Sequence, residues 1–137
     1  MEGTRIELDL TQVGMIPDGD HVVLVQKLER QVKVGDKWNK DGTKTVPPEE
    51  FAVAERDCKR LHFTLMITGK GSIWHDLYLG EKSLPFLKNF MKATGVNITK
   101  DGFDPDEAVG KQVGINVATK EDPTYGAQTQ ITKVWKV

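Results

Sequence analysis

Two aromatic residues, Trp74 and Tyr78, have the types and the spacing of a stacking site. They lie four positions apart in the stretch RLHFTLMITGKGSIWHDLYL, residues 60–79. Side chains of an extended strand alternate between two faces, so both rings and Asp76 share one face. Aromatic rings on an exposed sheet face are surfaces on which nucleobases stack. We predict stacking at both rings; the alternative is that a helix or the N-terminal arm covers them as part of the core.

The two rings lie in the second strand of a predicted β-hairpin. Apolar and polar residues alternate over residues 61–67 and again over residues 73–79. We expect a turn of three or five residues, because this register keeps Asp76 off the core face. It would pair Leu65 with Leu77 and Phe63 with Leu79, and would gather on the other face His62, Thr64, Met66, Thr68, Trp74, Asp76 and Tyr78.

Basic residues cluster before and at the start of this hairpin. A long loop, residues 33–59, is rich in glycine and proline, and long loops in small domains are often functional. It also carries Trp38, and a later loop carries Tyr125; we predict that both flank the stacking face. Cations along such a path would contact a phosphate backbone, whereas the alternative is a solvated surface. The predicted phosphate contacts are Lys27, Arg30, Lys33, Lys37, Lys40, Lys44, Lys59 and Arg60.

Other chemistries fail on spacing. Cys58 and His62 have ligand-like spacing, but His62 and His75 fall on opposite faces of the predicted hairpin and no fourth metal ligand is evident. No phosphate-binding loop, calcium loop or nucleophile–histidine set is recognisable. We therefore expect no enzymatic activity, no metal and no cofactor.

Length and composition are those of one globular domain. The chain has 137 residues, which we assign to a single domain, 1–137, with 28% charged residues and a net charge of −1. This charge provides no overall basic field, although a local basic groove matters more than the sum. No apolar run is long enough for a membrane span and no signal peptide is apparent, so we expect a cytoplasmic protein without membrane contact.

The predicted elements follow a known order. Residues 1–17 form an N-terminal arm or edge strand, followed by a strand over residues 21–32, the long loop, the hairpin, a helix from Ser83 to Gly95, and two final strands. We therefore predict an all-β protein with one or two short helices: a five-stranded OB-fold barrel, β-β-β-α-β-β. In that fold the ligand face is formed by strands 2 and 3 and by the loops joining strands 1–2 and 4–5.

Several segments also resemble a known family. The segments IPDGDHVVLV, SLPFLKNFMKATG, AVGKQVGINVATKED and QITKV look like those of bacteriophage OB-fold single-stranded-DNA-binding proteins. The resemblance spans most of residues 15 to 134. It implies sequence-independent coating of single-stranded DNA in phage replication or recombination, in the host cytoplasm. It also implies phage replication or recombination proteins as partners.

Two functions other than DNA binding are considered. A small barrel also serves as a protein-interaction module, and the nearly neutral charge suits that role. A nuclease would need a metal-binding carboxylate cluster, which the sequence does not offer. Single-stranded DNA binding remains the main prediction, and a homo-oligomer stays open.

Overall fold

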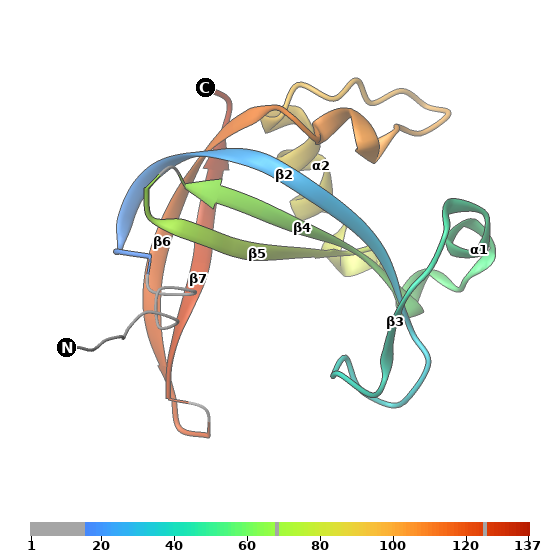
Figure 1. The fold of residues 1–137 in the computed structure, drawn as a ribbon. Coiled ribbons are helices and arrows are strands. Elements are labelled where there is room, and N and C mark those ends of the chain that lie inside the picture. The colour runs from blue at the N-terminus through green and yellow to red at the C-terminus, as the bar shows by residue number, and fades with distance from the viewer. Residues whose placement is uncertain (1–15, 68, 125) are drawn as a thin grey trace.

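The fold is an antiparallel sheet with one helix packed on its core. The computed structural model describes residues 16–67, 69–124 and 126–137. The predicted all-β class is confirmed (Figure 1). The strands are β2 (Gly19–Lys33), β3 (Thr43–Thr45), β4 (Lys59–Ile67), β5 (Gly71–Tyr78), β6 (Gln112–Asp122) and β7 (Gly126–Trp135). The helices are α1 (Pro48–Val53) and α2 (Leu84–Ala93), with 3-10 turns η2 (Arg56–Cys58), η3 (Glu81–Ser83) and η4 (Pro105–Ala108).

Strand β2 is the strand that both halves of the sheet share. The strand order is β5-β4-β2-β6-β7, and β3 pairs with the end of β2. Residues 19–24 of β2 pair with β6, whereas residues 24–32 pair with β4. The β2–β4 register shifts between Val25 and Lys27, and such a bulge bends a strand. Figure 1 shows β2 curving over the other strands as one long arc.

The β4–β5 hairpin has the predicted faces but not the predicted pairs. Leu65 lies opposite Ile73, and Phe63 lies opposite His75. The predicted partners were therefore wrong. Gly71 already pairs with Ile67 at a φ of 112°, so three residues separate the strands, one of the two predicted lengths, but the turn lies closer to β4 than the predicted pairs require. The error is four positions along β5 (77 − 73), an even number, so no side chain changes face.

Helix α2 covers the core between the two edges of the sheet. Leu87, Phe90 and Met91 recur at helical spacing and are buried. The Phe90 ring lies 4.9 Å from that of Phe63. Within the described residues β5 and β7 do not pair with each other, and α2 contacts both. The helix ends at Ala93, and Gly95, the residue predicted to stop it, has a φ of 83°.

The remaining predictions agree with the structure in part. The strand over residues 21–32 is confirmed within β2, and the long loop contains β3 and α1. Ser83 immediately precedes α2, but its side chain makes no capping hydrogen bond. The predicted arm lies outside the described residues except for Ile16 and Pro17, and Ile16 is buried. In the described part of the chain, no helix has the length and apolar character needed to cross a membrane.

Candidate nucleic-acid interface

The outer face of β2, β4 and β5 is built from rows of paired residues. Residues directly opposite each other on antiparallel strands point to the same side of the sheet. We call the surface made by three adjacent rows the aromatic face. From one end to the other, the rows are Lys27–Thr64–Trp74, Glu29–His62–Asp76 and Gln31–Arg60–Tyr78.

Trp74 and Tyr78 differ in how much of the ring is available. Trp74 is 65% exposed, and one side of its ring contacts His62 at 5.4 Å between ring centroids. Tyr78 is 36% exposed. Trp74 therefore lies outside the core that the described residues form, whereas the N-terminal arm considered as its cover lies outside the described residues up to residue 15. The two rings stand at opposite ends of the aromatic face with the His62–Asp76 row between them.

Trp38 comes from the loop between β2 and β3 and contacts the Tyr78 end. Its ring centroid is 5.6 Å from that of Tyr78, with an interplanar angle of 66°. The loop is closed at its base by the backbone N–H of Val34, which donates to the carbonyl oxygen of Gly42 at 2.8 Å. The Gly42 N–H in turn donates to Asn39 Oδ1 at 2.7 Å. These bonds hold Trp38 close to the sheet.

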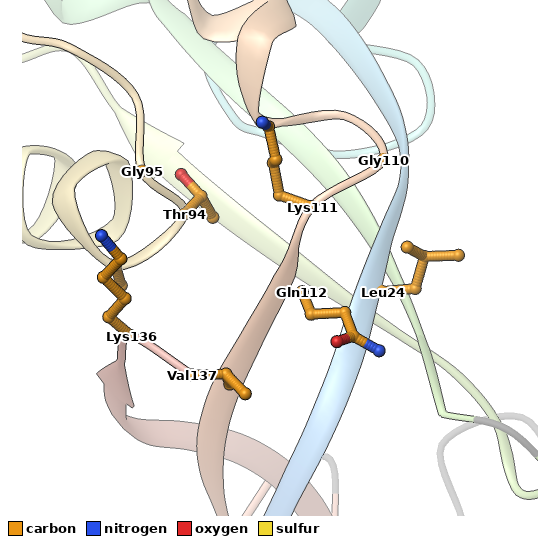
Figure 2. Close-up of a pocket in the computed structure, with 9 residues that line it drawn as sticks. Leu24, Thr94, Gly95, Gly110, Lys111, Gln112, Lys136 and Val137 are labelled. Carbon is orange, nitrogen blue, oxygen red and sulfur yellow. The ribbon is translucent and has the colours of Figure 1, made fainter.

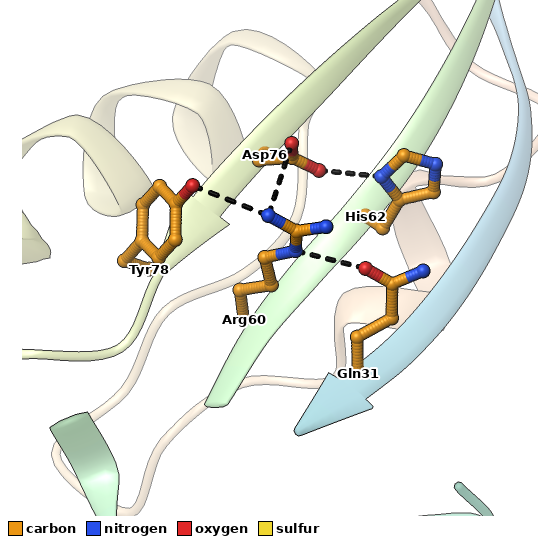
Figure 3. Close-up of polar contacts among 5 residues, drawn as sticks. All are labelled: Gln31, Arg60, His62, Asp76 and Tyr78. Carbon is orange, nitrogen blue, oxygen red and sulfur yellow. Dashed lines mark hydrogen bonds and ion pairs between the residues drawn. The ribbon is translucent and has the colours of Figure 1, made fainter. Parts of the chain in front are cut away.

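Arg60 contacts both the Trp38 ring and the Tyr78 ring and links them to the strands. Its Cζ is 4.5 Å from the Trp38 ring centroid and 5.8 Å from that of Tyr78, distances of cation–π contact. Nε donates to Gln31 Oε1 at 2.8 Å, and Nη1 donates to the Tyr78 hydroxyl at 3.3 Å (Figure 3). The Arg60 side chain is only 13% exposed. Arg60, a predicted phosphate contact, therefore holds the aromatic face together.

Asp76 connects the two ends of the aromatic face. Its Oδ1 lies 2.5 Å from His62 Nδ1, and its Oδ2 lies 3.5 Å from Arg60 Nη1. Figure 3 shows the carboxylate between the imidazole and the guanidinium. His62 contacts Trp74, whereas Arg60 contacts Tyr78. Sequence reasoning did not assign these roles; the signal available was that Asp76 shares a face with His62.

The other predicted cations fall into three groups. Two of them make hydrogen bonds to oxygen atoms of the protein. Arg30 makes a double hydrogen bond to Asp106, both at 3.0 Å, and Lys59 Nζ donates to the carbonyl oxygen of Phe51 at 3.1 Å. Lys27 and Lys44 make exposed ion pairs with Glu29 and Glu50.

The cations nearest to Trp38 in the sequence are the ones left for a ligand. Within the described residues, Lys33, Lys37 and Lys40 make no ion pair; Lys37 and Lys40 are exposed on the loop that carries Trp38. Tyr125 lies outside the described residues, so its predicted place beside this face is not described.

The two histidines considered as metal ligands, His62 and His75, lie on opposite faces of the sheet. His75 lies on the core face, with its ring 5.2 Å from that of Phe90, whereas His62 lies on the aromatic face. Burial lowers the pKa of His75 to about 4, partly opposed by the negative charge of Asp76. In the described parts of the chain, no three His, Cys, Asp or Glu side chains gather as metal ligands.

One hollow of the surface lies away from the aromatic face. It has a volume of about 660 Å³ and lies between the end of α2, the turn before β6 and the last residues of the chain. Figure 2 shows Lys111 and Lys136 on either side of Thr94. Neither an aromatic ring nor a carboxylate side chain lines this hollow. It therefore offers none of the stacking surface found on the aromatic face.

Comparison with known proteins adds no constraint on function. Neither the models of protein families nor the curated proteins contain a match to this chain.

Proposed function

We propose that this protein binds single-stranded DNA without requiring a sequence motif. The observation that carries the proposal is a Trp74 ring that is 65% exposed on a sheet face which also bears Tyr78, a residue that the loop residue Trp38 contacts. Exposed aromatic rings beside cations form the usual platform for single strands, since every base has a ring face to stack. The sequence resemblance supports a role in phage DNA replication or recombination.

The proposed fold is the OB-fold. The described long strands follow the expected order, with a helix between the third and fourth, and Trp74 and Tyr78 of the aromatic face are on the third. Closing the barrel would require the sheet edges at β5 and β7 to meet. In the described residues, α2 lies between them instead. We therefore regard the barrel as an open one.

Replacing Trp74 tests the stacking role directly. Trp74→Ala should weaken binding of a fluorescent, mixed-sequence single strand about 5- to 150-fold, the equivalent of one stacked base. Trp74→Phe should recover part of the affinity. Phe86→Ala is the matched control, because Phe86 is an equally exposed aromatic residue, 69%, on α2. Thermal unfolding of each variant separates a binding defect from a folding defect.

The outcomes distinguish the candidate functions. Tighter binding to a single strand than to a duplex of the same sequence supports the proposal. No binding at low salt would reject it and would favour the alternative, a protein-interaction module, whose partner a pull-down would recover. Unfolding of Trp74→Ala would show that this ring is structural.

The loop lysines should determine the salt dependence. Each phosphate contact adds about 0.7 to the slope of log affinity against log salt for a single strand. The double variant Lys37→Ala, Lys40→Ala should therefore lower this slope by about 1.4. Arg30→Ala is the control: it removes the pair with Asp106, so it should lower stability and leave the slope unchanged. Equal slopes for the lysine variant and the wild type would exclude both lysines as phosphate contacts.

A further inference from the structure

The middle row of the aromatic face carries a carboxylate at each end and so offers hydrogen-bond acceptors between the two rings. Asp76 and Glu29, at opposite ends of the middle row, are 28% and 30% exposed. An ionised carboxylate has no hydrogen to donate. The Nδ1 of His62 is beside Asp76 Oδ1, so we assign the ring hydrogen to Nδ1. The second nitrogen, Nε2, is then an acceptor in the neutral ring.

A base stacked on Trp74 would turn its pairing edge toward this row. Trp74 is 65% exposed and shares its face of the sheet with Asp76, so we place a stacked base on the exposed part of this ring, next to the middle row. In a pyrimidine, the bond to the sugar and the pairing edge are on opposite sides of the ring. The phosphates would avoid the carboxylates and stay on the solvent side. The pairing edge therefore faces Asp76, two residues along β5 from Trp74.

Pyrimidines differ at the edge that would meet this carboxylate. Cytosine has an amino group at C4, which donates a hydrogen bond, and Asp or Glu side chains are its usual acceptors. Thymine and uracil have an oxygen there, which would place its lone pairs against the carboxylate. Holding this oxygen against the carboxylate with no hydrogen between them costs more binding free energy than one hydrogen bond contributes.

We propose that Asp76 determines a base preference: bound to the aromatic face, cytosine is favoured over uracil and thymine through its 4-amino group. This inference depends on the proposed single-strand binding and adds a base preference to it. Asp76 keeps the capacity for this contact because each carboxylate oxygen has two lone pairs, and each oxygen has a single partner in the structure.

Oligomers of deoxycytidine and deoxyuridine of equal length provide the test. The two bases have nearly equal ring area, and neither carries the methyl group of thymine, so stacking is matched. The expected result for the intact chain at low salt is about tenfold tighter binding of the cytidine oligomer. Equal affinity, or tighter binding of the uridine oligomer, would overturn the inference and leave single-strand binding intact. Absence of binding to both would reject single-strand binding itself.

Asp76→Asn assigns the preference to this residue. The amide keeps an oxygen for His62 but adds an NH₂ group that can donate to the uracil oxygen. The cytidine-to-uridine affinity ratio should fall to about one, with uridine binding improved. An unchanged ratio in a folded variant would show that another residue sets the preference. If the variant does not fold, an oligomer of N4,N4-dimethyldeoxycytidine, which has no amino hydrogen to donate, should lose the advantage over the uridine oligomer on the wild-type protein, and an unchanged advantage would overturn the inference.

Discussion

At the scale of single residues, neighbouring side chains on β5 face two different environments. His75 points to the core and packs against Phe90, whereas Asp76 points to the aromatic face and contacts His62 and Arg60. The alternation of the sequence predicts this division, because it depends only on strand geometry. The contact of Trp38 with Tyr78 could not be predicted in detail, since it depends on the path of a loop 40 residues earlier (78 − 38).

The buried imidazole of His75 makes stability depend on pH. Its pKa is about 4 in the folded protein, compared with 6.5 when unperturbed. Between these values the unfolded chain binds more protons than the folded one, so the free energy of unfolding falls as the pH decreases from 6.5 to 4. The fall amounts to at most about 3 kcal/mol. His75→Phe should remove this dependence.

Urea unfolding at several pH values measures the His75 effect. The difference in free energy of unfolding between His75→Phe and the wild type should be constant above pH 6.5. Below that pH it should change in favour of the variant. Parallel curves across this range would mean that His75 becomes protonated without disturbing the core.

At the scale of elements, the β2–β3 loop is organised around Gly42. This glycine is buried, and its backbone makes hydrogen bonds with Val34 and Asn39. A Cβ at position 42 would overlap the carbonyl oxygen of Lys37. The sequence predicts a functional loop here because glycine, lysine and tryptophan occur together. It does not predict the close backbone approach, which involves no side chain at Gly42.

Gly42→Ala should therefore displace Trp38 without unfolding the sheet. We expect single-strand affinity to fall about fivefold, the lower end of the effect of one stacked base. Thr45→Ala, at an exposed position in the adjacent β3, is the control. Wild-type affinity in a folded Gly42→Ala protein would show that the position of Trp38 does not contribute to single-strand binding.

The β4–β5 hairpin shows which part of its geometry can be predicted from the sequence. Hydrophobic alternation defines the two faces, and these were predicted correctly. The pairs depend on where the turn begins, and a glycine with positive φ allows pairing to start inside the apparent turn, at Gly71. Because the alternation repeats every two residues, a register shift of four residues keeps every side chain on the same face. The hydrophobic pattern therefore cannot distinguish the two registers.

At the scale of the whole molecule, α2 seals the core between β5 and β7. The order of elements was predictable from periodicity and turn residues. Whether the sheet closes was not, because this depends on strand twist and on the volume that Phe90 and its neighbours occupy. Phe90 is fully buried, and its ring contacts those of Phe63 and His75.

Two phenylalanines of α2 should therefore differ in their effect on stability. Phe90→Ala should lower the free energy of unfolding by about 3 to 5 kcal/mol, the cost of a large cavity. Phe86→Ala, on the exposed side, should change it by less than about 0.5 kcal/mol. Denaturant unfolding measures both, and similar losses for the two variants would contradict the role given to α2.

The division of β2 between two partners has a consequence for the order of folding during synthesis. Strand β4 is the nearer partner of β2 in the chain, whereas β6 begins only at Gln112. Contacts between nearby segments close smaller loops and form faster. We therefore expect the ribosome to release the β2–β4–β5 meander first. The surface proposed to contact DNA would then form on a nascent chain in which β2 has not yet paired with β6.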